Sequence, residues 1–152
     1  MKSVRFATKM DCEKIRDFLG QAKMEDDKIN ELYGQFMLLE EDGNIQAVIG
    51  YEQVEQDALI RSCLFTPAVD NVTFLHFFET FLQYTKEKSI RQLYLLTKHP
   101  QSLTIFQFFQ FYPVDKEQVS EGIRRLEHFC KNVKQPKVII LNCQLLTKLS
   151  TD

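Results

Sequence analysis

The chain of 152 residues has no tryptophan, only five glycines and four prolines, and no long uninterrupted apolar run. Without Gly-rich or Pro-rich stretches it contains no linker or low-complexity tract, which excludes collagen-like and disordered chains. No stretch approaches the roughly 18 apolar residues of a membrane-spanning helix, and the first twenty residues lack the apolar core of a signal peptide. These absences predict one cytoplasmic domain over residues 1–152, since a chain of about this length usually forms one domain.

A surplus of positive charge is also missing. Nineteen Lys and Arg against 21 Asp and Glu give a formal net charge of −2. Nucleic acids and anionic membranes select proteins with a basic surplus, so we expect neither as a partner. With 44% hydrophobic and 26% charged residues, the composition is that of a globular domain with a true core.

Cysteine and histidine are too scattered for a metal centre or a disulfide framework. There is no C-x-x-C pair, and no histidine stands at zinc-finger spacing. The sequence therefore predicts no metal site and reduced, buried thiols at Cys12, Cys63, Cys130 and Cys143.

Hydrophobic periodicity divides the chain into alternating strands and helices. Strands are predicted at 4–6, 35–40, 45–54, 58–65, 93–96 and 138–141. Helices are predicted at 9–23, 29–33, 72–87, 102–109 and 115–133. Asp42-Gly43 predicts a hairpin turn between two strands, because glycine accepts the positive φ of such turns. The order is β-α-α-β-β-β-α-β-α, followed by a further helix and a last strand.

Several short phrases, in this order and spacing, resemble the GNAT superfamily of acetyl-CoA-dependent N-acetyltransferases, small bacterial members in particular. The phrases are Val4-Arg5-Phe6-Ala7-Thr8, Gly50-Tyr51-Glu52, Leu59-Ile60-Arg61-Ser62, Leu95-Leu96-Thr97 and Phe111-Tyr112-Pro113-Val114. The resemblance covers nearly the whole chain. It implies an α/β (α+β) fold in which a mixed, mostly antiparallel central sheet is flanked by helices.

The resemblance also implies an N-acyltransferase that moves an acetyl group from acetyl-CoA, or a relative of it, to a small-molecule or protein amine. Glu52 stands where a general base would accept the proton of the acceptor ammonium, directly or through water. The same residue also suits a solvated strand carboxylate or one paired with Arg61. Both interpretations remain open from the sequence.

The pyrophosphate loop of the family, Q/R-x-x-G-x-G/A, lets backbone N–H groups approach phosphates at a helix N-terminus. Here Asp70 replaces its basic or amide residue, and Thr73 and Leu75 replace its small ones. The loop is therefore degenerate, and we expect coenzyme A to bind no tighter than about millimolar. The residues that the resemblance places against coenzyme A are Cys63, Phe65, Asn71, Val72, Thr73, Phe74, Leu75 and Phe106.

A tyrosine that can protonate the leaving thiolate in many members is replaced here by Phe106, which has no proton to donate. Gln110 replaces a nearby glycine of the same family pattern.

The departures from the family pattern leave two alternatives to an enzyme. One is a catalytically degenerate GNAT-fold module that binds a protein or another small ligand. The other is a homodimeric interaction protein that pairs through the edge of its C-terminal strand.

Overall fold

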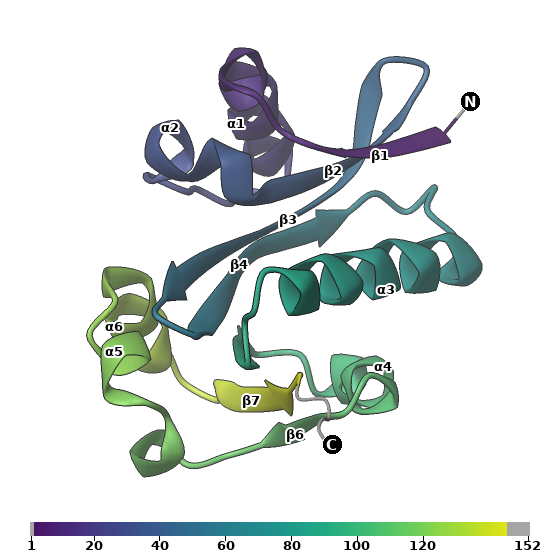
Figure 1. Cartoon of the computed structure of the whole chain (residues 1–152). Helices are drawn as coiled ribbons and strands as arrows, with labels where there is room; N and C mark the ends of the chain where they lie inside the picture. Colours follow the sequence, from purple (N-terminus) through teal and green to yellow (C-terminus); the bar gives the residue numbers. More distant parts are fainter. Residues whose placement is uncertain (1, 146–152) are drawn as a thin grey trace. The chain divides into compact units, whose positions relative to one another are not determined.

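The computed structural model describes residues 2–145, which form two compact units (Figure 1). The first unit contains residues 2–52 and 61–81, and the second contains residues 53–60 and 82–145. Seven strands are hydrogen-bonded in the order β1-β2-β3-β4-β5-β7-β6. This mixed, mostly antiparallel sheet confirms the predicted fold class. A single domain over residues 1–152 stays a prediction that includes residues outside the described part, 1 and 146–152.

Three antiparallel strands begin the first unit: β1 (Lys2–Phe6), β2 (Phe36–Glu41) and β3 (Asn44–Val54). The predicted turn joins β2 to β3, with positive φ at Asp42 (53°) and Gly43 (83°). Gly50 pairs with Phe36 across the two strands, and a Cβ at Gly50 would lie 2.7 Å from the Phe36 ring. Glycine is required there because the aromatic ring fills the space of any side chain.

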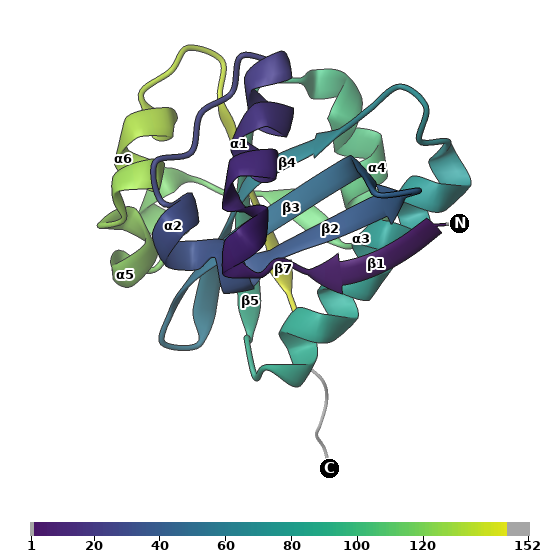
Figure 2. The same ribbon diagram turned by 90° about the horizontal axis from the view of Figure 1, so that it is seen from above.

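Helices cover both faces of these strands in the first unit (Figure 2). A short 3-10 turn (Lys9–Asp11) leads into α1 (Cys12–Gln21), and α2 (Ile29–Leu32) follows. Their apolar side chains form one core with alternate residues of β2 and β3: Ile15, Phe18, Leu19, Ile29, Phe36, Leu38 and Val48. The N-terminal part of α3 (Asn71–Glu87) buries its aromatic face, Phe74, Phe77, Phe78 and Phe81, and Phe81 lies 5.9 Å from Tyr51 on β3.

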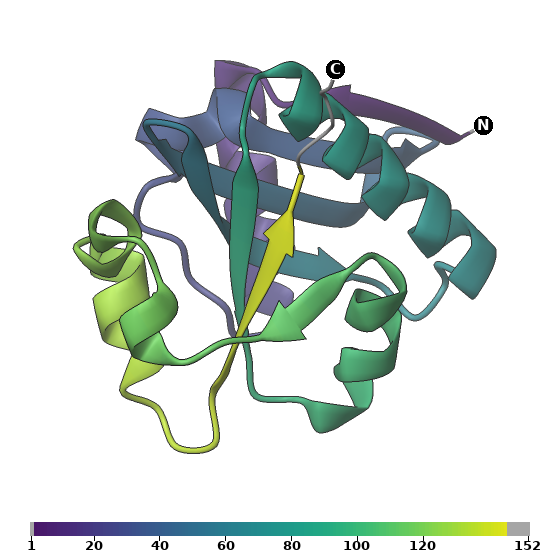
Figure 3. The same cartoon turned by 60° about the horizontal axis from the view of Figure 1, so that its bottom comes forward.

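In the second unit, β4 (Asp57–Phe65) begins parallel to β5 (Gln92–Thr97), and β7 (Ile139–Gln144) is antiparallel to β5 (Figure 3). A strand missing from the sequence prediction, β6 (Phe111–Pro113), pairs with the other edge of β7. Three residues, two of them exposed, are too few to show a strand pattern. The C-terminal strand is therefore paired on both sides, and the predicted edge pairing through it is wrong.

The single helix predicted over 115–133 is also wrong. The capping pair Asp115 and Gln118 exists, but it begins a 3-10 turn (Lys116–Gln118), which is followed by α5 (Glu121–Arg124) and α6 (Glu127–Val133). Val119 and Leu126 have extended backbones, with ψ near 138° and 137°, and these interrupt the helix. The breaks let Val119, Ile123 and Phe129 enter one core with Tyr94.

The predicted helix over 102–109 is confirmed as α4 (Leu103–Phe108), which follows a 3-10 turn at Pro100–Ser102. Just after α4, Gln110 has a positive φ of 70°. Glycine adopts this backbone at helix ends without strain, so the family's glycine at this position has a physical reason that Gln110 does not share.

All four cysteines are free, as predicted, but they are not all buried. Cys12 and Cys143 are buried, but Cys63 is half-buried and Cys130 is exposed, which corrects the predicted burial of these two thiols. Burial raises the pKa of the Cys143 thiol to about 12. Within residues 2–145, no helix is long and apolar enough to cross a membrane, and no cluster of three potential metal ligands forms.

Candidate functional site

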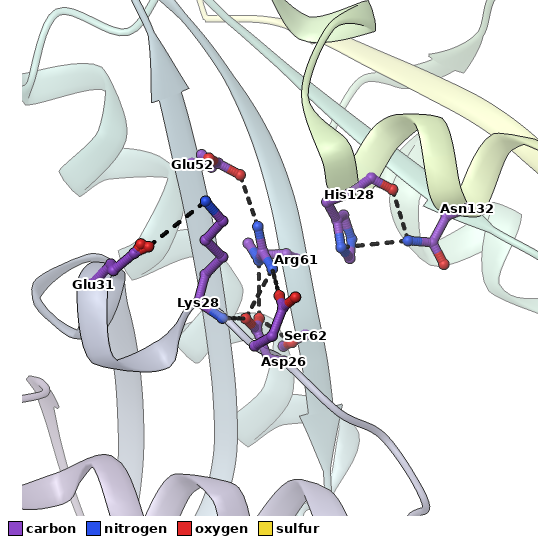
Figure 4. Close-up of polar contacts among 9 residues, drawn as sticks. Asp26, Lys28, Glu31, Glu52, Arg61, Ser62, His128 and Asn132 are labelled. Carbon is purple, nitrogen blue, oxygen red and sulfur yellow. Dashed lines mark hydrogen bonds and ion pairs between the residues drawn. The ribbon is translucent and has the colours of Figure 1, made fainter.

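A buried arginine is the centre of the main polar cluster of the first unit (Figure 4). Arg61 lies on β4 with only 3% of its side chain exposed. Its Nε and Nη2 donate to the two carboxylate oxygens of Asp26 at 2.9 and 2.8 Å. This bidentate contact fixes the plane of the guanidinium, because the guanidinium and the carboxylate are both planar and the spacing of the two nitrogens matches that of the two oxygens.

The third nitrogen of the same guanidinium holds the candidate base. Arg61 Nη1 donates to Glu52 Oε1 at 2.7 Å, and 18% of the Glu52 side chain stays exposed to solvent. The sequence left a solvated carboxylate and an Arg61-paired carboxylate as alternatives to catalysis, and the structure has the pair. Because Asp26 orients Arg61 and Arg61 orients Glu52, one carboxylate is held in place at the surface by another that is buried.

A distortion of β4 makes this cluster possible. Neighbouring residues of a regular strand point to opposite faces, yet the Ser62 hydroxyl also donates to Asp26 Oδ2, at 2.8 Å. Ser62 has a φ of 58°, in the left-handed region, so the strand is locally turned and presents both side chains to Asp26. A left-handed backbone at a residue other than glycine lowers the stability of the folded state by about 1–3 kcal/mol, and the hydrogen bonds to Asp26 help to offset this loss.

Asp26 is the residue of this cluster that the sequence prediction missed. It lies within the polar run Glu25-Asp26-Asp27, which indicated only the end of a helix. Burial raises its pKa, but hydrogen bonds from Arg61, the Lys28 N–H and Ser62 outweigh burial, and the net pKa is lowered. The available signal was Arg61 itself, since an arginine in a buried apolar strand requires a carboxylate partner.

The second feature of the first unit is the start of α3. Asp70 Oδ1 accepts the N–H of Thr73 at 2.7 Å, and the Asp70 carbonyl accepts the N–H of Phe74 at 2.9 Å. Asp70 is therefore the N-cap of the helix. The hydrogen bond from the Thr73 N–H is the main reason why the pKa of Asp70 is lowered.

Comparisons with known proteins extend these observations. No protein-family model matches the sequence. The uncharacterized protein YwlB of Bacillus subtilis is 24% identical over 140 residues, which cover 91% of this chain and 94% of that protein.

Among solved structures, N-acetylglutamate synthase from Neisseria gonorrhoeae, complexed with coenzyme A and N-acetyl-glutamate, matches with a TM-score of 0.75 and 18% identity. The match covers 97% of this chain but only 36% of the synthase, so this chain spans about a third of that protein. An acetyltransferase of the GNAT family from Staphylococcus aureus matches with a TM-score of 0.72 and 12% identity, over 96% of this chain and 100% of that chain. The chain has the GNAT fold.

A Mycobacterium tuberculosis protein in complex with coenzyme A gives a further match with a TM-score of 0.75 and 15% identity, over 95% of this chain and 99% of that protein. At such identities the likeness shows the fold alone. The roles of individual residues in this GNAT fold must therefore be argued from their own contacts.

Most residues predicted to contact a cofactor lie along the end of β4 and the first turns of α3. Phe65 is 43% exposed at the end of β4, with its ring 4.5 Å from that of the buried Phe74. Asn71 and Val72 are exposed in the first turn of α3, and Thr73 and Leu75 are half-buried. These residues therefore lie together in one part of the first unit.

Cys63 and Phe106, which were also predicted to contact coenzyme A, lie in different surroundings from the residues at the start of α3. Part of the Cys63 residue reaches solvent, but its thiol is desolvated, and this burial raises the pKa of the thiol to about 12. A protonated thiol is a poor nucleophile, which agrees with a packing role. Phe106 belongs to the second unit, where its ring lies 5.9 Å from that of Phe111.

Proposed function

We propose that this chain is a GNAT-type N-acyltransferase that moves an acetyl group from acetyl-CoA to a small-molecule or protein amine, with Glu52 as the general base. The observation that carries the proposal is that Glu52, on β3 of a chain with the GNAT fold, keeps 18% of its side chain exposed although its Oε1 is paired with Arg61. Solved structures of this fold that contain coenzyme A support the choice of cofactor. The free cysteines support a reducing compartment, the cytoplasm.

Coenzyme A would supply the acetyl group as a thioester, which is attacked by an amine only in its neutral form. An acceptor that arrives as an ammonium ion must first lose a proton, and the Glu52 carboxylate can accept it directly or through water. Arg61 fixes the direction of this carboxylate because Asp26 prevents the guanidinium from turning away. The positions of Asp26 and Arg61 thus prepare the base before an acceptor binds.

The start of α3 does not fit the diphosphate of coenzyme A in the manner of the family's loop. The Asp70 carboxylate already takes the Thr73 N–H, and its charge repels phosphate. Thr73 and Leu75 also carry side chains where the pattern has small residues. We therefore assign no step of the transfer to this loop.

A second candidate function is a non-catalytic GNAT-fold module that binds a partner or another ligand. The cap at Asp70 favours it, because a helix start that satisfies its own amide has no need of phosphate. This module would retain the Glu52–Arg61–Asp26 cluster for stability alone.

Replacement of Glu52 by glutamine separates the two candidates. With acetyl-CoA and a panel of amines, Glu52→Gln should lower turnover by roughly 10²–10⁴ and leave coenzyme A binding nearly intact. Glu40→Gln is a matched control, since Glu40 is also held by an arginine, Arg5, at 2.9 Å. Equal turnover in the native protein and Glu52→Gln would remove Glu52 from the mechanism, and no acetylation of any amine would favour the non-catalytic module.

A further inference from the structure

Two amides in the first turn of α3, those of Thr73 and Phe74, are hydrogen-bonded to Asp70. Asp70 accepts a hydrogen bond from the N–H of Thr73, and the Thr73 side chain and the positive charge of Lys2 also favour its ionised form, so that the pKa of Asp70 is lowered. Lys2, on β1, lies with its Nζ 3.4 Å from Thr73 Oγ1. The cation beside this helix start therefore balances the charge of an aspartate of the chain itself.

A helix start attracts anions because its first N–H groups have no partner within the helix and carry partial positive charge. An aspartate at the N-cap uses both properties: it accepts an N–H and places a full negative charge at the end of the helix. A diphosphate would have to displace this carboxylate from Thr73 and then remain close to it. Like charges at such distances repel even in water.

We propose that Asp70 closes the start of α3 to phosphate, so that this chain binds its thioester donor through the pantetheine arm and gains no affinity from the diphosphate. This inference rests on the proposed function, and it narrows the donor to thioesters for which the phosphates are dispensable. The pantetheine arm is the portion of coenzyme A that carries the thiol and has no diphosphate.

The test compares coenzyme A with pantetheine by calorimetric titration. The native protein should bind the two within about threefold of each other, because the diphosphate adds nothing. Asp70→Asn keeps an N-cap side chain and removes only the charge, whereas Asp70→Gly removes both. Both variants should bind coenzyme A roughly tenfold more tightly than the native protein, and pantetheine with unchanged affinity.

Asp115→Asn is the matched control, since Asp115 caps the 3-10 turn Lys116–Gln118. It should change neither affinity. A tenfold preference of the native protein for coenzyme A over pantetheine would overturn the inference. So would weaker coenzyme A binding by Asp70→Asn with a native unfolding midpoint, because Asp70 would then assist the cofactor.

A second probe, inorganic pyrophosphate, does not depend on the proposed function. In amide NMR spectra, millimolar pyrophosphate should leave the Thr73 signal of the native protein unmoved and shift it in Asp70→Asn and Asp70→Gly. If no form binds coenzyme A or pantetheine and no amine is acetylated, the proposed function fails, while a pyrophosphate shift confined to the two variants still supports closure by Asp70. A Thr73 shift in the native protein, or none in either variant, would reject closure.

Discussion

Two arginines of the first unit each donate hydrogen bonds to one aspartate and one glutamate, but the two arginines differ in exposure to water. Arg5 donates to Asp11 at 2.8 and 2.8 Å and to Glu40 at 2.9 and 3.1 Å, with 37% of its side chain exposed. Arg61 donates two hydrogen bonds to Asp26 and one to Glu52, with 3% of its side chain exposed. The hydrogen bonding to the glutamate and the exposure of the arginine therefore both differ between the two clusters.

Each arginine has one carboxylate partner nearby in the sequence and one 35 residues away, but the segments that they join differ. Asp11 is six residues from Arg5 and caps its own turn by accepting the Thr8 N–H at 2.7 Å. Asp26 is 35 residues from Arg61, so this contact ties the segment before α2 to β4. We infer that Arg5 ties the turn at Asp11 to β2 through Glu40, whereas Arg61 ties the segment before α2 and the candidate base to β4.

Removal of the buried cation should have the largest effect. Arg61→Met leaves Asp26, whose side chain is 1% exposed, as an uncompensated buried charge, so the free energy of unfolding should fall by about 3–5 kcal/mol. Urea denaturation at neutral pH measures the change. The double variant Arg61→Met with Asp26→Leu should recover a substantial part of it, since a buried pair exchanged for apolar residues often costs little. A loss below about 1 kcal/mol in Arg61→Met would contradict the assigned role.

Acid should weaken both clusters through their aspartates. The pKa of Asp11, through its hydrogen bond from Arg5, and that of Asp26 lie below the ordinary value of 3.8 in the folded protein. Their contribution to the free energy of unfolding is therefore fully present above that value and is lost progressively as the pH falls below it. Urea midpoints at pH 6 and pH 3 should show this fall, and Asp26→Asn and Asp11→Asn should each reduce it. An unchanged fall in both variants would assign the acid sensitivity to other carboxylates.

Loss of the exposed cation should have the smallest effect. Arg5→Met should lower the free energy of unfolding by about 1–2 kcal/mol, less than Arg61→Met, because Arg5 is 37% exposed and water can replace it beside Asp11 and Glu40, whose side chains are 7% and 14% exposed. The loss should shrink further at high salt, unlike that of Arg61→Met. If Arg5→Met costs as much as Arg61→Met, exposure is not what separates the two clusters.

The Thr8–Asp11 contact of the Arg5 cluster could be anticipated from the sequence, whereas the contact between Arg61 and Asp26 could not. Thr8 and Asp11 have the spacing of a capping box, and their contact depends only on residues close in the chain. Asp26 gave no such sign, because its partners Arg61 and Ser62 become neighbours only after β4 is placed and locally turned at Ser62. The positive φ of Ser62 is likewise absent from any pattern of apolar and polar residues.

The candidate site also has some features that the sequence predicts and others that only the structure shows. Glu52 and the departures at Asp70, Thr73 and Leu75 were evident from the sequence, since they depend on residue type and order alone. The hydrogen bond by which Asp70 caps α3 at Thr73 became evident only in the structure, although these two residues are close in the chain.

The sequence by itself determined most strands and helices, because periodicity and turn residues act over a few positions, and its resemblance to the GNAT superfamily implied the fold class. Its failures were the three-residue strand β6, the interruptions at Val119 and Leu126, and the exposure of Cys130. Only the tertiary structure decided that Arg61 binds Asp26 and Glu52 together. The physical reason is desolvation: a charge buried by packing must find its partner in space, however far away that partner lies in the chain.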